Sequence, residues 1–309
     1  IFNDASSAFP ELEIVMPKEG KFLSKGEILK EANKSDALIT LLSDQIDADF
    51  ISQIENVKVI SNFAVGFNNI DIKAANDKGI AVGNTPDTLT HSTAETALTL
   101  LLMLSRRALE LQQKVKVGDW KRWEPEVDNG YDLREKKVGI VGFGRIGQAF
   151  AKMAYQIWDA EILVWERPSA HQIKCDFPFR VVNPTVFKNE VDIISLHCPL
   201  NEGTQHFLNS DLIQSMRKNF FFINTARGGC HDETELLKGL MSGKILGVGL
   251  DVTNPEPMLK DSPLLQSERV VVLPHIGSAA DRTRKEMAYQ CLENIRAGLK
   301  GETLPFPVN

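Results

Sequence analysis

Cysteine is scarce in this chain of 309 residues, which has only four, at Cys175, Cys198, Cys230 and Cys291. They are widely spaced and form no CxxC pair, so the sequence predicts neither a disulfide framework nor a bound metal. We therefore expect reduced thiols in a cytoplasmic protein. A nucleophilic role for Cys198 would need a base and an oxyanion site that the sequence does not supply.

Long apolar runs and an excess of positive charge are also missing. The longest apolar run, from Leu98 to Leu104, is interrupted by Thr99. It is far shorter than the ~20 residues that a membrane span needs. Lys and Arg number 35 against 41 Asp and Glu, which gives a formal net charge of -6. Since the basic residues are scattered, the sequence predicts neither a membrane nor a nucleic acid as partner.

The length of the chain and its alternating pattern predict the fold class. A chain of this size exceeds what one hydrophobic core usually serves, so we expect two domains. Short apolar segments alternate with amphipathic ones, which is typical of α/β proteins with parallel sheets covered by helices. The predicted strands are Ala37–Leu42, Val57–Ser61, Ile80–Val82, Val138–Val141, Ile162–Trp165, Asp192–Leu196, Phe220–Ile223, Gly247–Asp251 and Val270–Leu273.

Less regular segments complete this pattern. Ile1 and Phe2, followed by Asn3 and Asp4, are predicted to be the end of a further strand. From Asp176 to Arg180 we expect a surface loop and a short strand.

The order of the segments predicts a discontinuous domain. Thr88 to Val117 contains neither Gly nor Pro and has an apolar middle, so it is predicted to be one long helix between two bodies. A second series of strands begins only at Val138, and the chain closes with a helix from about Ser278 to Leu299. We therefore expect one domain to be inserted into the other. The expected ranges are 1–87 and 277–309 for the first domain and 88–276 for the inserted one.

A glycine-rich turn follows the predicted strand Val138–Val141. The sequence GFGRIG places Gly142, Gly144 and Gly147 between this strand and a helical pattern. In such a setting the first glycine permits a tight turn, the second lets a pyrophosphate approach the backbone, and the third allows close packing of helix and strand. The N-terminus of the helix adds free N–H groups for the phosphates. The motif therefore predicts a dinucleotide site.

The choice of dinucleotide depends on the end of the next strand. Glu166 lies nineteen residues after Gly147, where an acidic side chain hydrogen-bonds the adenosine ribose hydroxyls. It would repel a 2'-phosphate, so NAD is the expected cofactor. NADP remains the alternative, because the neighbouring Arg167 could pair with that phosphate.

Three later strands each end in polar residues. They read FFFINTARGG, GVGLDVTNPEP and VVVLPHIGSA, and they carry Arg227, Asp251, Glu256 and His275. Taken singly, such an Arg is more often a solvated charge and such a His a structural residue. In a doubly wound sheet, however, the carboxyl ends of strands line the ligand crevice, so these side chains are expected to converge.

Together with the glycine turn, these segments resemble the D-isomer-specific 2-hydroxyacid dehydrogenase family over almost the whole chain. The nearest resemblance is to the glyoxylate and hydroxypyruvate reductases, through SNFAVGFNNIDI at 61–72, NTPDTLTHSTAE at 84–95 and WKRWEPEVDNGYDL at 120–133. The resemblance implies two doubly wound parallel-sheet domains, with a Rossmann-like nucleotide domain inserted into a flavodoxin-like substrate domain. It also implies a 2-oxo acid reductase that uses NAD or NADP.

The same resemblance implies a role for individual residues. Arg227 would bind the substrate carboxylate, His275 would be the acid/base and Glu256 would orient it, while backbone amides of Val65 and Gly66 would contact the carboxylate. The implied dinucleotide contacts are Thr93, Gly142, Gly144, Arg145, Ile146, Gly147, Glu166, Arg167, His197, Pro199, Thr204, Thr225, Ala226, Arg227, Asp251, His275 and Gly277.

The chemistry of 2-oxo acid reduction agrees with these roles. The carbonyl carbon receives a hydride and the oxygen a proton, which an imidazolium donates well near neutral pH. Glu256 would stabilise that imidazolium, and the guanidinium of Arg227 would hold the carboxylate in two-point geometry. Asp251 would accept a hydrogen bond from the nicotinamide carboxamide.

A second copy of the chain is the expected protein partner. The apolar helix and the tryptophans Trp120 and Trp123 after it predict a homodimer, and the resemblance implies that Trp123 reaches the substrate pocket of the neighbouring subunit. The alternative is a Trp123 packed inside its own domain.

Two other functions remain open at this stage. One is an NAD-sensing corepressor-like binding protein without catalysis. The other is a phosphoglycerate-type dehydrogenase, which would call for additional basic residues at the mouth of the pocket.

Overall fold

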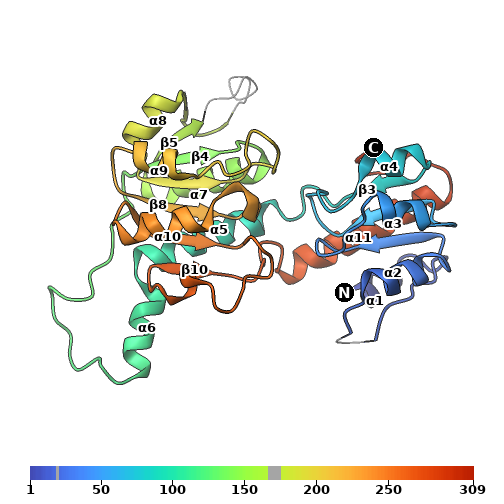
Figure 1. Ribbon diagram of the computed structural model, residues 1–309, viewed down its shortest axis with the longest axis horizontal. Coiled ribbons are helices and arrows are strands. Elements are labelled where there is room, and N and C mark those ends of the chain that lie inside the picture. Colours follow the sequence, from blue (N-terminus) through green and yellow to red (C-terminus); the bar gives the residue numbers. More distant parts are fainter. Residues whose placement is uncertain (19–20, 166–174) are drawn as a thin grey trace. The chain divides into compact units, whose positions relative to one another are not determined.

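The computed structural model describes residues 1–18, 21–165 and 175–309 (Figure 1). Contacts between residues divide the chain into two compact units. The terminal unit comprises Ile1–Leu89 and Ser278–Asn309, and the central unit comprises Thr90–Gly277. Across the described ranges, no helix is both long and apolar enough to cross a membrane.

The terminal unit is built on a three-stranded parallel sheet. Its strands lie in the order β1 (Ala37–Thr40), β2 (Val59–Asn62) and β3 (Ala81–Gly83). The central strand β2 is buried along its whole length, as expected of a strand covered on both faces. The helices of this unit are α1 (Phe2–Ser6), α2 (Lys25–Ala32), α3 (Ala48–Gln53), α4 (Ile72–Asp77) and α11 (Asp281–Leu299).

Helices cover both faces of this small sheet. One core contains Phe50, Ile60 and Val82, and a second contains Val59 and Ile295, where α11 crosses β2. The side chains of Ser24, Asp47 and Asp71 accept hydrogen bonds from backbone N–H groups in the first turns of α2, α3 and α4. The N-terminal helices are therefore positioned by local capping as well as by burial.

The strand end predicted at Ile1 and Phe2 is wrong, because Phe2–Ser6 form the short helix α1. This helix packs on α11, and the ring of Phe2 lies 5.3 Å from that of Phe63. Phe2 and Ala5 are partly buried by this helix packing and not by strand pairing, a tertiary effect that a short segment does not reveal.

The central unit contains a seven-stranded sheet, parallel throughout, in the order β10-β9-β8-β7-β4-β5-β6. The order reverses between β4 and β7, which is the switch point of a doubly wound fold. The α/β prediction with doubly wound parallel sheets is confirmed. The strands are β4 (Lys137–Val141), β5 (Glu161–Trp165), β6 (Arg180–Val182), β7 (Ile193–Leu196), β8 (Phe220–Asn224), β9 (Ile245–Leu250) and β10 (Val270–Val272).

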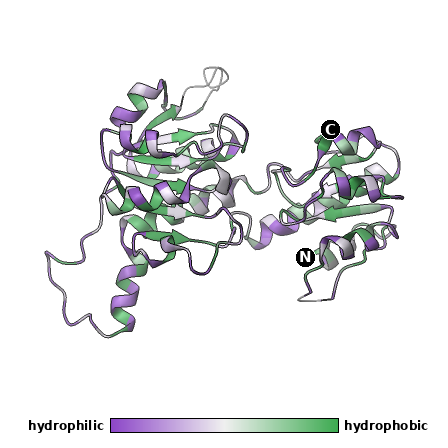
Figure 2. Ribbon diagram, in the orientation of Figure 1, coloured by the Kyte–Doolittle hydropathy of each residue, from purple (hydrophilic) through white to green (hydrophobic). Residues whose placement is uncertain are grey.

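Helices cover both faces of this sheet, and the strands between them are strongly hydrophobic (Figure 2). One face carries α5 and α7 over a core that includes Leu100, Ile140 and Phe150. The other carries α8, α9 and α10 over a core that includes Phe187, Leu212 and Leu236. The helices are α5 (Thr90–Ser105), α6 (Ala108–Lys116), α7 (Arg145–Trp158), α8 (Pro184–Glu190), α9 (Ser210–Ser215) and α10 (Glu233–Met241), with short 3-10 helices at Gly228–Cys230 and Pro263–Gln266.

The single helix predicted from Thr88 to Val117 is wrong, because the structure divides it into α5 and α6. Arg107 between them adopts a φ of +52°, in the left-handed region where a helix cannot continue. Its guanidinium pairs with Glu110 and donates to the carbonyl of Asn129, so the side chain stabilises the break. The apolar middle of the predicted helix lies in α5, which has buried residues, whereas α6 has none.

Candidate active site

The glycine turn lies between β4 and α7, at the switch point of the central sheet. Gly142 has a φ of +96°, and a Cβ there would lie 2.5 Å from the backbone nitrogen of Cys198. A Cβ on Gly147 would lie 2.2 Å from the carbonyl oxygen of Gly142. Neither position tolerates a side chain without movement of the backbone. The turn is therefore held closely against the loop after β7 and against the first turn of α7.

Gly144 has a different environment. A Cβ built on it would meet no heavy atom of the protein within 4 Å, so its surroundings are open. Gly144 is the N-cap of α7, and no side chain caps this end of the 14-residue helix. Arg145 and Ile146 form the first turn that follows. Open space at the N-terminus of a long helix fits the pyrophosphate of a dinucleotide, because the backbone N–H groups there favour negative charge.

A partly exposed histidine links the ends of β7 and β8. His197 Nε2 lies 2.9 Å from the hydroxyl of Ser195, and Nδ1 lies 3.4 Å from that of Thr225. Burial lowers the pKa of His197 to about 3, so the ring is neutral at physiological pH. A neutral imidazole has one donor and one acceptor, which suits a link between two hydroxyl groups.

Two other predicted dinucleotide contacts belong to the loop after His197. Thr204 is fully buried, and its hydroxyl donates to the carbonyl oxygen of Pro199 at 2.6 Å. This bond connects the two ends of the segment from Pro199 to Thr204 and so stabilises the loop after β7. A direct contact of Thr204 with the dinucleotide stays a prediction.

Glu256 and His275 form an ion pair in the central unit. His275 Nδ1 lies 2.5 Å from Glu256 Oε1, while Glu256 Oε2 accepts the backbone N–H of Thr253 at 3.3 Å. Burial raises the pKa of Glu256, but the hydrogen bond and charge of His275 and the charge of Arg227 outweigh it and hold this pKa below its usual value. The carboxylate is therefore ionised and occupies Nδ1, which leaves Nε2 as the ring nitrogen able to exchange a proton.

The backbone around His275 is held by Asp251. His275 has a φ of +53°, which is uncommon for a residue other than glycine. The next two backbone N–H groups, of Ile276 and Gly277, donate to Asp251 Oδ1 and Oδ2 at 2.7 and 2.8 Å. Burial raises the pKa of Asp251, and these backbone hydrogen bonds oppose the rise. Besides the contact predicted with the carboxamide, Asp251 thus positions the loop that carries the histidine.

Thr93 supports the same loop from the first turn of α5. Its hydroxyl donates to the carbonyl oxygen of Gly277 at 3.1 Å. A Cβ on Gly277 would lie 3.1 Å from Asp251 Oδ2 and 3.3 Å from the Thr93 side chain. The predicted residues Thr93, Asp251 and Gly277 therefore form one packed group behind His275.

Arg227 follows β8 and is largely buried. Burial lowers its pKa, and the negative charge of Glu256 opposes this effect. The guanidinium stays charged, because arginine is not deprotonated in proteins. A Cβ on the adjacent Gly228 would lie 1.9 Å from the carbonyl oxygen of Thr253, so the loop that carries Arg227 packs directly on the loop that carries Glu256. The predicted convergence of the two loops is visible in this contact.

Asn224, at the end of β8, is a residue that the sequence analysis did not single out. Its Nδ2 donates to the carbonyl oxygen of Arg227, and its Oδ1 accepts the N–H of Ala226, both at 2.9 Å. Asn224 is fully buried and fixes the backbone on which Arg227 stands. The signal that could have revealed it is the change from an apolar strand to a polar residue at the carboxyl end of β8.

Val65 and Gly66 lie in the terminal unit, in the loop after β2. Their carbonyl oxygens accept hydrogen bonds from Asn84 Nδ2 and Asn62 Nδ2, each at 2.8 Å. These two bonds fix the orientation of the peptide groups in the loop. Their role at a substrate carboxylate stays a prediction.

Other predicted residues lie apart from these loops. Trp123 is 79% exposed, so the alternative that it packs inside its own domain is wrong. Glu166 and Arg167 lie outside the described residues.

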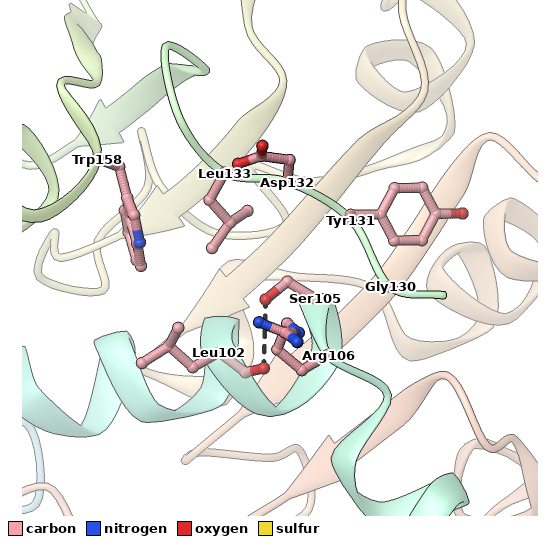
Figure 3. Close-up of a pocket in the computed structure, with 8 residues that line it drawn as sticks. All are labelled: Leu102, Ser105, Arg106, Gly130, Tyr131, Asp132, Leu133 and Trp158. Carbon is pink, nitrogen blue, oxygen red and sulfur yellow. Dashed lines mark hydrogen bonds between the residues drawn. The ribbon is translucent and has the colours of Figure 1, made fainter. Parts of the chain in front are cut away.

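A separate pocket of about 340 Å³ lies beside the end of α5 (Figure 3). It is lined by Leu102, Ser105 and Arg106 of this helix region, by residues 130–133 and by Trp158. Neither Arg227 nor His275 contributes to it, so it is distinct from the loops described above.

Comparison with known proteins identifies the family. Residues 98–277 match the family model described as D-isomer specific 2-hydroxyacid dehydrogenase, NAD binding domain. The chain belongs to this family. It is therefore an NAD-binding oxidoreductase that acts on the CH–OH group of 2-hydroxy acids, and the prediction of a nicotinamide-dependent dehydrogenase is confirmed.

Individual members of the family are similar over most of their length. A glyoxylate reductase of Thermococcus litoralis is 39% identical over 301 residues, covering 96% of this chain and 90% of that protein. The human glyoxylate reductase/hydroxypyruvate reductase is 39% identical over 269 residues, covering 87% and 82%. The crystal structure of the TT0316 protein from Thermus thermophilus superposes with a TM-score of 0.90 at 37% identity, covering 99% of this chain and 96% of that one.

Proposed function

We propose that this dehydrogenase reduces a small 2-oxo acid, of the glyoxylate or hydroxypyruvate type, to the D-2-hydroxy acid. The observation that carries the proposal is the ion pair between His275 Nδ1 and Glu256 Oε1, on a loop packed against that of Arg227. A proton donor, its carboxylate partner and a cation for a carboxylate are the groups that this reaction needs. The relatives named glyoxylate reductase support the choice of substrate class.

Each of the three side chains has a separate task in this proposal. When bound, the dinucleotide would supply the hydride that the carbonyl carbon needs. His275 Nε2 donates a proton to the carbonyl oxygen, and Glu256 stabilises the imidazolium before the transfer. The guanidinium of Arg227 binds the carboxylate in two-point geometry and so fixes which face of the carbonyl is presented. Backbone amides of Val65 and Gly66 are proposed as further donors to the carboxylate.

The residues of the glycine turn would hold the dinucleotide. The open surroundings of Gly144 and the uncapped N-terminus of α7 accommodate a pyrophosphate. We propose that the other parts of the dinucleotide are held or supported by Thr93, His197, Thr225, Ala226 and Asp251. For the adenosine ribose we propose Glu166, which favours NADH over NADPH because a carboxylate repels a 2'-phosphate.

We also propose that the chain acts as a cytoplasmic homodimer. The four cysteines are free thiols, which suits a reducing compartment. Apolar side chains are exposed on α6 and on the segment after it, at Val115, Val117, Trp120 and Trp123. Exposed apolar residues concentrated in one region are typical of an interface between subunits. The exposed Trp123 is available to reach a neighbouring subunit.

A panel of initial rates tests the function. Glyoxylate, hydroxypyruvate, pyruvate and a phosphorylated 2-oxo acid are each supplied with NADH and with NADPH. We expect the highest kcat/KM for glyoxylate or hydroxypyruvate with NADH, and Glu166→Ser should narrow the gap between the two coenzymes. No turnover of any 2-oxo acid would favour an NAD-sensing binding protein, and a preference for the phosphorylated acid would favour a phosphoglycerate-type dehydrogenase.

Light scattering tests the oligomeric state separately. A monomer in light scattering would contradict the proposed dimer.

A further inference from the structure

Behind the loop of Arg227 lies a buried amide whose orientation is fixed. Asn224 Oδ1 accepts the N–H of Ala226, and Asn224 Nδ2 donates to the carbonyl oxygen of Arg227. A backbone N–H can only donate and a carbonyl can only accept, so these bonds determine which end of the amide is nitrogen. The second hydrogen of Nδ2 is left for His231 Nδ1, which lies 2.8 Å away.

This contact determines the protonation state of His231. Since Nδ1 accepts a hydrogen bond, the ring is the neutral tautomer with its proton on Nε2. The side chain is fully buried, and its ring meets the ring of Phe222 edge to face at 5.9 Å. Burial lowers the pKa of His231 to about 4, which agrees with a neutral ring at physiological pH. His231 therefore acts as a permanent acceptor for Asn224.

The other edge of the ring faces Glu233 at the start of α10. Among the residues that the structure describes, His231 Nε2 has no hydrogen-bond partner, and Glu233 Oε1 lies 4.0 Å from it. The same Glu233 oxygen accepts the backbone N–H of Asn254 at 3.0 Å. Asn254 lies two residues before Glu256. Glu233 thus lies near the His231 ring and also binds the backbone of the loop that carries Glu256.

We propose that His231 is a positioning residue for Arg227, which it holds through the amide of Asn224. The inference rests on the proposed function in one respect, namely that Arg227 binds the substrate carboxylate. An apolar residue at position 231 would leave a buried N–H of Asn224 without an acceptor, and the amide would then turn to find another. Rotation of the amide would release the backbone of Ala226 and Arg227. The guanidinium would lose its fixed position relative to Glu256.

Two substitutions separate this role from simple packing. His231→Leu fills the space but accepts no hydrogen bond, whereas His231→Asn places an amide oxygen close to the position of Nδ1. For His231→Leu we expect the KM for the 2-oxo acid to rise roughly ten-fold, as when one buried donor loses its partner. His231→Asn should restore most of that loss. The NADH dissociation constant should change less than the KM in both variants, since the glycine turn that is proposed to hold the pyrophosphate is unchanged.

Phe187→Leu is the matched control, because Phe187 is fully buried in the same core but belongs to α8. It should lower the Tm and leave the KM unchanged. The proposal is overturned if His231→Leu behaves in the same way, or if His231→Asn and His231→Leu raise the KM equally. Either result would mean that His231 contributes packing alone and does not position Arg227.

A second measurement keeps this inference separate from the proposed function. A wild-type protein that reduces no 2-oxo acid would overturn the function, and the nitrogen NMR signals of the His231 ring would still test the hydrogen bond. A proton on Nε2 and an accepting Nδ1 near neutral pH support the bond with Asn224. A proton on Nδ1, or on both nitrogens, overturns it whatever the activity.

Discussion

His275 Nδ1 lies 2.5 Å from Glu256 Oε1, and this pair joins two loops that the central sheet places at the ends of different strands. Glu256 arrives after β9 and His275 after β10. The N–H groups that follow His275 are held by Asp251 at the end of β9. Glu256 therefore fixes the ring of His275 and Asp251 fixes the backbone that follows it, so the position of Nε2 is restricted.

Replacing Glu256 by Gln should change the pH dependence of 2-oxo acid reduction. The pKa of Glu256 lies below its usual value despite burial, so the carboxylate stays ionised as the pH falls and loses its charge only in acid. Gln removes the negative charge beside the His275 ring, and reduction should then fail at a lower pH than in the wild type as the pH rises. Initial rates across pH measure this shift. Glu235→Gln, which removes the charge of an ion pair with Lys238 within α10, is the control.

An unmoved basic limb in the Glu256→Gln variant would mean that Glu256 is not the partner of His275. The control must retain the wild-type profile for this conclusion to apply to position 256 alone.

Replacing His275 by Gln should remove the transferable proton while keeping a polar side chain. Turnover should fall by on the order of 10² to 10⁴. NADH affinity, measured by fluorescence, should remain close to wild type. Turnover within ~10-fold of wild type would contradict a role for His275 as the acid.

Arg227→Lys retains a positive charge but lacks the planar fork that binds both carboxylate oxygens. We expect a higher KM and a lower kcat together, because orientation as well as affinity is lost. Steady-state kinetics with glyoxylate measure both. Arg217→Lys, at an exposed position after α9, should change neither. An increase in KM alone would show that Arg227 binds the substrate without orienting it.

The strands could be predicted because their sequences are apolar at consecutive positions. Each of the nine predicted strands from Ala37 onward lies within two residues of an observed one. The expected convergence of polar side chains at the carboxyl ends of β8, β9 and β10 followed from the same pattern, since parallel strands bring their ends to one edge. The roles of these side chains came from the resemblance and stay predictions.

Other features could not be predicted from local sequence. The break between α5 and α6 depends on a left-handed Arg107 that pairs with Glu110 and Asn129, and the last of these is distant in sequence. The helix α1 depends on packing against α11. The role of Asn224 depends on hydrogen bonds to a loop whose conformation the sequence does not specify. In each case a tertiary contact decides between local alternatives that the sequence leaves open.

Acid should destabilise the folded chain through its buried histidines. The pKa of His197 falls from 6.5 to about 3 on burial, and that of His231 to about 4. As the pH decreases below 6.5, the unfolded chain binds protons that the folded chain does not, so the free energy of unfolding decreases. Each histidine contributes up to about 1.4 kcal/mol per pH unit. Urea unfolding at several pH values measures the slope, which His197→Asn should reduce. A slope identical to wild type would contradict a His197 that is neutral in the folded chain.

Two glycines of the same turn should respond differently to alanine. At Gly142 a methyl group would lie 2.5 Å from the backbone of Cys198 at a φ of +96°, so Gly142→Ala should lower both the Tm of the free protein and its affinity for NADH. At Gly144 a methyl group meets no protein atom within 4 Å. Gly144→Ala should therefore fold normally and lose NADH affinity by roughly ten-fold or more, because the methyl group occupies the space of the pyrophosphate.

The contrast between the two variants is what tests the placement of the dinucleotide. Gly26→Ala, inside α2 of the terminal unit, is the control, since a methyl group there also meets no neighbour within 4 Å. It should leave NADH affinity unchanged and slightly raise the Tm, because alanine favours a helix more than glycine does. Thermal melts without cofactor and fluorescence titration with NADH give the two quantities. If Gly144→Ala binds NADH as tightly as Gly26→Ala does, the pyrophosphate does not lie against Gly144, and the helix α7 is not its binding site.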